Sequence, residues 1–298
     1  MASTLKDLSK ELADTAETAG RSVVRVEARR RLPASGVVWS ADGLVVTASH
    51  VVEREEEILV GLPEGGQAEA TFVGRDPGTD LALLKAEAKA LTVAEWGDAS
   101  ELRVGNIILA LGRPGRTVQA TLGILSARGE GWRTPLGGEI DLFLRTDALM
   151  APGFSGGPLV GAAGKVYGVN SSALSREAGI AIPTATIGRV VSDLAAHGRV
   201  RRGYLGVGVQ PVRLPSGLSE KTGQDSGLLL TSVEDDGPAH HAGLMLGDVI
   251  IAFDDASTRS MPDLLGLLTG ERVGSSVGVK VVRAGKVEER KVTVGERP

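Results

Sequence analysis

The chain has 298 residues, of which 42% are hydrophobic and 23% charged, as in a globular protein with a substantial core. A formal net charge of −4 gives no electrostatic basis for a nucleic-acid or anionic-membrane partner. The absence of cysteine excludes a disulfide framework and a cysteine-ligated metal, and four histidines are too few to favour a histidine-ligated zinc site. We therefore expect neither a metal nor a cofactor.

The first 21 residues predict an amphipathic helix. Leu5, Leu8 and Leu12 recur at helical spacing, and Gly20 is suited to end the helix. Charged residues interrupt every apolar run, so this segment does not resemble a signal peptide. No stretch of the chain approaches the roughly 18 apolar residues of a membrane span. On these grounds we expect a cytoplasmic protein, or one of the cell envelope whose leader has been removed.

Residues 22–198 predict an all-β domain. Short runs rich in Val, Ile and Leu are separated by Gly, Pro and Asp, the pattern of many short strands in barrels or a sandwich. Asp42-Gly43 is typical of a hairpin turn. After Pro183 the apolar spacing becomes helical, and Gly198 is suited to end that helix.

A linker at 199–203 and a smaller domain at 204–298 follow. The smaller domain predicts several strands and two helices, the second of which has Ser260 as its N-cap. Its last two strands form a hairpin that turns at Ala284-Gly285. The two regions share no repeat, so the sequence predicts a mainly β protein in which a compact α+β module follows the larger β domain.

Three residues of the β domain have the types that nucleophilic catalysis requires. Ser155 lies in a glycine-rich stretch, His50 follows a predicted strand, and Asp80 follows a Pro-Gly loop. In such a triad the histidine takes the proton of the serine, while the aspartate orients the histidine and stabilises the imidazolium. The backbone N–H groups of Gly153 and Ser155 would form the oxyanion hole, because glycine permits the tight curl this requires.

Taken singly, each of these residues has an ordinary structural explanation. Ser-Gly-Gly-Pro is common in turns, aspartate caps turns, and a histidine after a strand is usually only a polar residue. The three residue types together, in this order and within a β-rich chain, favour catalysis.

The blocks around these residues resemble those of the HtrA/Deg serine proteases, a trypsin-like family with the chymotrypsin fold. The resemblance rests on TASHVV, RDPGTDLALLK, TDALMAPGFSGGPLV and AIPTATIGRVV, and on RGYLGVGVQPV, GPAHHAGLMLGDVI and VVRAGKVEERKVTVGERP for the PDZ domain that follows the protease in that family. It implies two six-stranded β-barrels, with His50 and Asp80 in the first and Ser155 in the second. It also implies an ATP-independent endopeptidase of protein quality control and stress response, which cleaves unfolded or damaged polypeptides.

The chain departs from the family beside the nucleophile. Phe154 stands where the family usually has a polar residue, most often Asn. This leaves open an alternative function, a proteolytically silent chaperone or peptide-binding scaffold whose oxyanion hole does not form. Family trimers are often held together by aromatic residues near the N-terminal end, whereas no aromatic precedes Trp39 here, so a homo-oligomer is also left open.

In trypsin-like enzymes the residues before the serine line the pocket for the substrate side chain that precedes the cut. The corresponding residues here are Leu149, Met150 and Ala151. We expect segment 170–179, including Asn170 and Ser171, to form the opposite wall. With no carboxylate among the residues before the serine, the sequence predicts cleavage after Val, Ala, Leu or Ile. The alternative is that Leu149 and Met150 are only core residues.

The PDZ resemblance implies a groove between the strand that starts at Tyr204 and the helix around Leu264–Leu268. A C-terminal peptide would add to that strand, and its carboxylate would be held by the backbone N–H groups of Tyr204, Leu205, Gly206 and Val207. Leu264 and Leu268 are the candidate groove residues, although their spacing also suits a core.

Two further clusters could suggest a metal in the smaller domain. Asp235-Asp236 and Asp254-Asp255 are paired carboxylates, and His240-His241 are paired imidazoles. Both acidic pairs lie in apparent turns and the histidines lack a third partner, so we interpret these residues as solvated loop positions.

Overall fold

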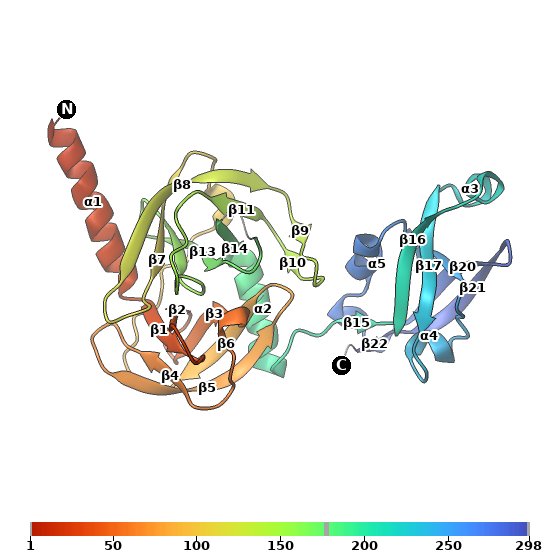
Figure 1. The fold of residues 1–298 in the computed structure, drawn as a ribbon, viewed down its shortest axis with the longest axis horizontal. Helices are drawn as coiled ribbons and strands as arrows, with labels where there is room; N and C mark the ends of the chain where they lie inside the picture. Colours follow the sequence, from red (N-terminus) through yellow and green to blue (C-terminus); the bar gives the residue numbers. More distant parts are fainter. Residues whose placement is uncertain (1, 176–178, 297–298) are drawn as a thin grey trace. The chain divides into compact units, whose positions relative to one another are not determined.

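The computed structural model describes residues 2–175 and 179–296, which divide into two compact units at Met1–Val200 and Arg201–Pro298 (Figure 1). Each unit is described by itself below. The first unit consists of two β-barrels with flanking helices, and the second is built on one antiparallel sheet.

Six antiparallel strands close the first barrel in the order β1-β2-β3-β6-β5-β4. They are β1 (Val23–Glu27), β2 (Ala34–Val38), β3 (Leu44–Ala48), β4 (Ile58–Gly61), β5 (Gln67–Asp76) and β6 (Leu81–Ala86). Small branched residues such as Val24, Val45 and Leu84 are buried inside it. The β2–β3 turn requires Gly43, whose φ is +100°, because a Cβ there would lie 2.5 Å from the carbonyl oxygen of Ala86.

The second barrel is also closed by six strands, in the order β11-β14-β13-β12-β7-β8. They are β7 (Ile107–Gly112), β8 (Gln119–Gly129), β11 (Phe143–Thr146), β12 (Pro158–Gly161), β13 (Val166–Ser171) and β14 (Gly179–Pro183). A small hairpin, β9 (Trp132–Arg133) with β10 (Glu139–Ile140), precedes β11. The expected double barrel is confirmed.

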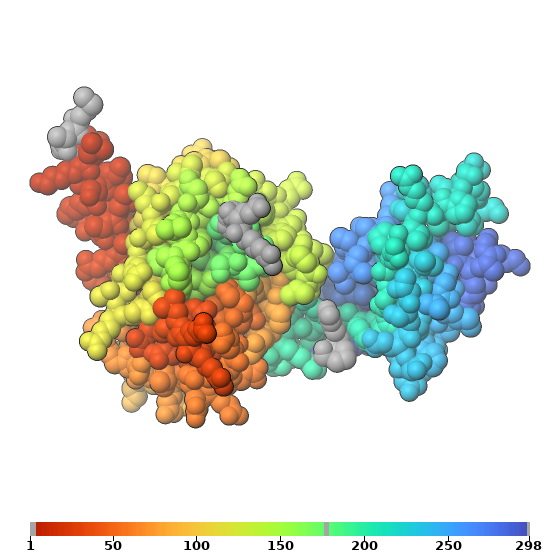
Figure 2. Space-filling model, viewed as in Figure 1, coloured from red at the N-terminus to blue at the C-terminus, as the bar shows by residue number. Residues whose placement is uncertain are grey.

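Two α-helices and two 3-10 turns complete the first unit. They are α1 (Ala2–Gly20), η1 (Ser49–Val51), η2 (Ala99–Glu101) and α2 (Thr184–His197). The N-terminal half of α1 projects away from the barrels (Figures 1 and 2), whereas Leu12 and Ala19 pack on their core. Helix α2 ends as predicted at Gly198, whose φ is +70° and whose N–H bonds the carbonyl of Leu194. No helix among residues 2–175 and 179–296 combines the length and hydropathy needed to cross a membrane.

The second unit holds a sheet in the order β16-β17-β18-β20-β21, with a further short strand on β18 and a separate two-stranded pair. Its strands are β15 (Gly203–Tyr204), β16 (Val207–Arg213), β17 (Ser226–Val233), β18 (Val249–Phe253), β19 (Ala256–Ser257), β20 (Ser276–Arg283), β21 (Lys286–Thr293) and β22 (Gly295–Glu296). The β20–β21 hairpin turns at Ala284-Gly285 as predicted, with positive φ at both residues. Strand β16 lies at one end of this order, so one of its edges is free of the sheet.

The described residues of the second unit, 201–296, also form three α-helices and one 3-10 turn. They are α3 (Ser216–Thr222), α4 (Pro238–His241), α5 (Met261–Leu267) and η3 (Gly270–Arg272). The expectation of two helices was wrong, because the polar turn-like stretch at Ser216–Thr222 also forms a helix. Ser260 caps α5 as predicted, and it does so in a capping box with Asp263.

Candidate active site

His50 and Asp80 form a close pair in the first barrel. His50 lies in η1, directly after β3, and Asp80 directly precedes β6. The Asp80 carboxylate accepts from Nδ1 of His50, with Oδ2 at 2.8 Å and Oδ1 at 3.0 Å, and Oδ1 also accepts the backbone N–H of His50 at 2.9 Å. This arrangement directs Nδ1–H of the imidazole toward Asp80 and leaves Nε2 as a proton acceptor.

The Asp80 side chain is buried and receives a further hydrogen bond. The Ser171 hydroxyl donates to its Oδ2 at 2.5 Å. The backbone at Asp80 has a φ of +59°, a left-handed conformation that aspartate adopts more readily than most residues. Its carboxylate is therefore fixed from both sides, by the histidine of the first barrel and by a serine of the second.

The Ser155 hydroxyl lies beside a second serine at the mouth of the site. Ser155 Oγ is 2.9 Å from the Ser172 hydroxyl, and the Ser172 N–H donates to Ser155 Oγ at 3.4 Å. The Ser172 hydroxyl in turn lies 3.4 Å from Nε2 of His50. Among the described residues no direct hydrogen bond joins Ser155 Oγ to Nε2 of His50. Sequence reasoning missed Ser172, since nothing in the pattern Asn-Ser-Ser shows which hydroxyl will face the nucleophile.

The loop that precedes Ser155 is tightly curled against neighbouring backbone. Gly153 and Gly156 have φ values of +89° and +85°. A Cβ at Gly156 would lie 2.1 Å from the carbonyl oxygen of Ser35, so only glycine fits there. Within the described part of the chain, the backbone N–H groups of Gly153 and Ser155 have no hydrogen-bond partner. Both N–H groups are therefore free to donate a hydrogen bond.

Phe154 occupies its own pocket beneath this loop. Its side chain is 1% exposed and packs with Ala110 and Ala148. A Cβ at Gly112 would lie only 2.7 Å from Cδ1 of the ring. The small side chains opposite the ring thus provide the space that an apolar residue at this position requires.

The residues expected to line the substrate pocket differ in their exposure. Leu149 is 70% exposed, so the alternative that it is a core residue is wrong. Met150 and Ala151 are partly buried against Phe154, and a Cβ at Gly179 would lie 2.8 Å from Cε of Met150. The Met150 side chain therefore packs against the backbone of Gly179, in space that any larger residue there would occupy.

The opposite wall does not have the expected side chains. Asn170 and Ser171 are both fully buried. Nδ2 of Asn170 donates to the carbonyl of Pro158, and the Ser171 hydroxyl binds Asp80. Neither side chain is available to a substrate here, because each is buried and bonded to its own partner, on opposite faces of the strand. Within segment 170–179, residues 176–178 lie outside the described residues.

Comparisons with known proteins identify the family of both units. The family model described as a trypsin-like peptidase domain matches residues 34–169, and the PDZ domain model matches residues 203–294. A solved structure of the HtrA-type protease AlgW with a decapeptide is 32% identical, has a TM-score of 0.78, and aligns over 96% of this chain and 98% of that one. The serine endoprotease from Yersinia pestis is also 32% identical, with a TM-score of 0.77 and coverage of 95% and 97%.

This chain belongs to the HtrA-type protease family. Among curated relatives, probable periplasmic serine endoproteases described as DegP-like from Ectopseudomonas mendocina and Chlamydia muridarum are 40% and 37% identical over 272 and 284 residues. The alignments cover 89% and 93% of this chain, but 56% and 57% of the relatives. The HtrA-type chain thus spans little more than half the length of these relatives.

The PDZ unit of this HtrA-type chain has a free strand edge where the peptide groove is expected. Helix α5 lies beside β16, and in the described residues the N–H groups of Leu205 and Gly206 have no partner. The side chains of Leu205 and Leu264 are each 2% exposed and belong to the core, whereas Val207 and Leu268 are only partly buried. Leu264 is therefore a core residue of this unit, as the alternative interpretation of its spacing had it.

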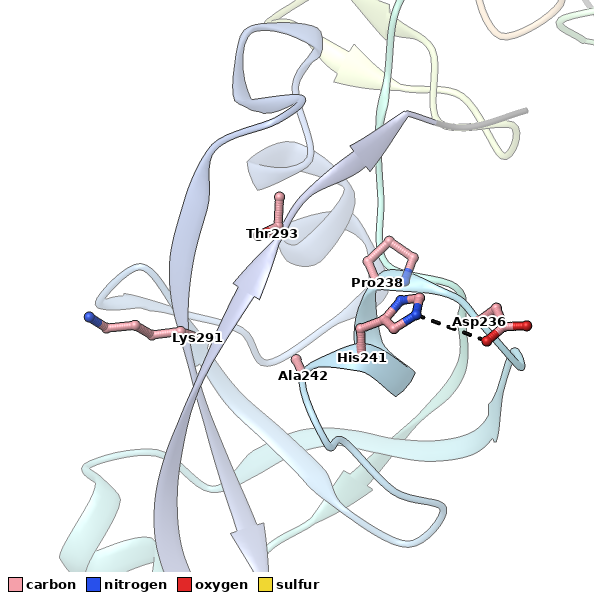
Figure 3. Close-up of a pocket in the computed structure, with 6 residues that line it drawn as sticks. All are labelled: Asp236, Pro238, His241, Ala242, Lys291 and Thr293. Atoms are coloured by element: carbon pink, nitrogen blue, oxygen red, sulfur yellow. Dashed lines mark ion pairs between the residues drawn. The ribbon is translucent and has the colours of Figure 1, made fainter.

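A separate hollow of the PDZ unit lies between α4 and β21. It is lined by Asp236, Pro238, His241, Ala242, Lys291 and Thr293 (Figure 3). Nε2 of His241 lies 3.9 Å from Oδ1 of Asp236, both side chains are exposed, and Lys291 points away from them. Asp254 and Asp255 instead pair with Arg272 and Lys280. The described residues contain no cluster of three or more His, Cys, Asp or Glu side chains placed to hold a metal ion.

Proposed function

We propose that this HtrA-type chain is an ATP-independent serine endopeptidase that cleaves unfolded or damaged polypeptides. Ser155 is the nucleophile, His50 the general base, and Asp80 the residue that orients the base. The single observation that carries the proposal is the His50–Asp80 pair, whose imidazole presents Nε2 on the side where Ser155 and Ser172 lie.

The reaction proceeds through an acyl-enzyme. Ser155 Oγ attacks the scissile carbonyl while Nε2 of His50 takes the hydroxyl proton, and the same proton passes to the leaving amine. The N–H groups of Gly153 and Ser155 stabilise the tetrahedral oxyanion, an effect typically worth about 10²–10³ in kcat for one donor. A water molecule, deprotonated by His50, then attacks the ester, and His50 returns this proton to Ser155 Oγ as the ester bond breaks and the carboxylic acid leaves.

The packing of Phe154 supports the enzyme over the silent scaffold. An apolar residue with no cavity would have to distort the loop, whereas here the ring is fully enclosed and the two N–H groups beside it are unpaired. The same loop supports cleavage after Val, Ala, Leu or Ile, since Leu149 and Met150 present only apolar atoms.

We also propose that the PDZ unit binds extended peptides with a free C-terminus. The peptide would add as a strand to the open edge of β16, beside α5, and its carboxylate would accept from the N–H groups of Leu205 and Gly206. Leu268 and Val207 are the partly exposed apolar residues available to its last side chain.

Casein degradation by the wild-type chain and by Ser155→Ala tests the protease. Ser192→Ala is the matched control, because the Ser192 hydroxyl binds only the carbonyl of Gly188 on α2. We expect activity in the wild type and the control, none in Ser155→Ala, and cuts after aliphatic residues by mass spectrometry. An inactive wild type, with peptide ligands present and over a range of temperature, would favour the scaffold.

The peptide-binding proposal is tested separately. A library of peptides ending in a free carboxylate is compared by fluorescence polarisation with the same peptides carrying a C-terminal amide. We expect selected sequences to bind only with the free carboxylate. Equal binding of both forms would contradict the groove assignment.

A further inference from the structure

Arg113 carries a buried charge at the end of β7. The residue is 6% exposed, and among the described residues no carboxylate lies within ion-pair distance of its guanidinium. Burial accordingly lowers the pKa of this arginine from its ordinary value. Removing a charge from water costs several kcal/mol unless other groups compensate, so the surroundings of Arg113 need an explanation.

Three backbone carbonyls surround the guanidinium. Nη2 donates to the carbonyl of Gly20 at 2.8 Å, and Nε donates to that of Val23 at 2.6 Å. Nη1 donates to the carbonyl of Arg116 at 2.8 Å. Gly20 is the last residue of α1 and Val23 the first of β1, so one side chain fixes the end of the N-terminal helix to the turn that follows β7.

The backbone of the same residue leads to the oxyanion loop. The N–H of Arg113 donates to Ser35 Oγ at 2.7 Å, and the Ser35 hydroxyl donates to the carbonyl of Gly153 at 2.7 Å. Ser35 N–H also donates to the carbonyl of Ser155 at 3.2 Å. Ser35 is fully buried, so water does not compete for these bonds.

Both neighbours of Arg113 are packed against that loop. A Cβ at Gly153 would lie 2.6 Å from the side chain of Pro114, and a Cβ at Gly112 would lie 2.7 Å from the ring of Phe154. Any shift of residues 112–114 must therefore move the loop that presents the two unpaired N–H groups.

We propose that Arg113 is a positioning residue of the oxyanion hole, which it holds through Ser35 and thereby couples to the end of α1. This inference rests on the proposed protease function. The guanidinium fixes residues 112–114 to α1 and β1. Ser35 bonds both the N–H of Arg113 and the carbonyl of Gly153, so the position of residue 113 fixes that of the Gly153 carbonyl. The N–H groups of Gly153 and Ser155 then keep their direction. A misplacement of about 1 Å in such a site can cost on the order of 100-fold in rate.

The test is steady-state cleavage of a peptide substrate by Arg113→Met. We expect kcat to fall about tenfold or more, with KM unchanged within a factor of about two, because the ground-state contacts of the substrate are not altered. Arg113→Lys should recover part of the loss, since an ammonium can still donate to the carbonyls. Arg25→Met is the matched control: Arg25 is a partly buried arginine of β1 that pairs with Glu27.

Ser35→Ala separates positioning from stability, because it breaks the link to Gly153 but leaves the guanidinium and its three carbonyls intact. We expect Ser35→Ala to lower kcat at unchanged KM, and the double variant to be no slower than Arg113→Met alone. Wild-type kcat in Ser35→Ala, or an equal loss in Arg25→Met, would overturn the proposal, even if Arg113→Met fails to fold. An inactive wild type would instead contradict the protease function itself.

Discussion

Ser155 and Ser172 share a hydrogen bond of 2.9 Å between their hydroxyl oxygens, and the Ser172 hydroxyl also lies 3.4 Å from Nε2 of His50. The Ser172 hydroxyl therefore lies between the Ser155 hydroxyl and Nε2 of His50, the proposed nucleophile and base. A resting hydroxyl that is bonded to Ser172 must leave that partner before its proton can pass directly to the imidazole.

Ser172→Ala should accelerate acylation. A neutral hydrogen bond contributes about 0.5–1.5 kcal/mol, so the loss of the bond to Ser172 should raise the acylation rate by a factor of about 2–10. The rate of labelling by a fluorophosphonate measures this step, with Ser192→Ala as the control. Slower labelling of Ser172→Ala would show instead that the second hydroxyl carries the proton to His50.

Gly112→Ala should reduce kcat by crowding the ring of Phe154. Its added Cβ would lie 2.7 Å from Cδ1 of that ring, so the ring and the loop above it must shift. Gly115→Ala is the matched control three residues away, because a Cβ there meets no atom within 4 Å. The kcat of peptide hydrolysis is measured for both variants. Equal values would show that the packing of Phe154 does not affect catalysis.

Met150→Ala should broaden the substrate pocket. Truncation removes the side chain that packs over Gly179, so a Phe before the cut should gain on a Val by about tenfold in kcat/KM. A peptide pair that differs only at that position measures the ratio. An unchanged ratio would mean that Met150 does not border the substrate side chain.

Asp248→Ala should destabilise the PDZ unit. The carboxylate is 2% exposed and accepts from Nε and Nη2 of Arg283 and from the N–H of Met245. Loss of these charge-assisted hydrogen bonds costs about 1.5–3 kcal/mol, which thermal unfolding will show. Asp255→Asn, in an exposed pair with Lys280, is the control and should leave the midpoint unchanged.

The Asp248 carboxylate should also make the stability of the PDZ unit depend on pH under acidic conditions. Burial by itself would raise the pKa of Asp248, but the hydrogen bonds from Arg283 and Met245 outweigh it and lower the pKa below the ordinary value. A lowered folded-state pKa contributes stability above the unfolded value of about 3.9 and loses it as pH falls through the folded-state pKa. The stability of the wild-type PDZ unit should therefore fall more steeply with decreasing pH below about pH 4. In Asp248→Ala this additional loss of stability should be absent.

Local sequence signals predicted the elements whose formation depends on neighbouring residues. Gly198 and Ser260 end and begin helices because their own backbone and side chain satisfy the exposed groups there. The glycines on both sides of Ser155 likewise predicted a tightly curled loop there. These features need no knowledge of distant packing.

Features that depend on contacts across the fold could not be predicted in this way. Ser171 and Ser172 are adjacent and chemically identical, yet one binds Asp80 and the other Ser155, because Ser171 ends β13 and Ser172 lies in the bend that follows. Asn170 and Leu264 are buried by contacts with distant segments of the chain, which the local residue pattern did not show. The bonds of Arg113 join segments about 90 residues apart in the chain, so no local pattern contains them.

The contacts of Ser35 with the loop around Ser155 join the two barrels at that loop. The nucleophile belongs to the second barrel, but its loop is bonded to Ser35 of the first, and Gly156 is pressed against the same residue. The conformation of the loop around Ser155 is therefore a joint property of both barrels, and a substitution that displaces Ser35 is expected to displace that loop as well.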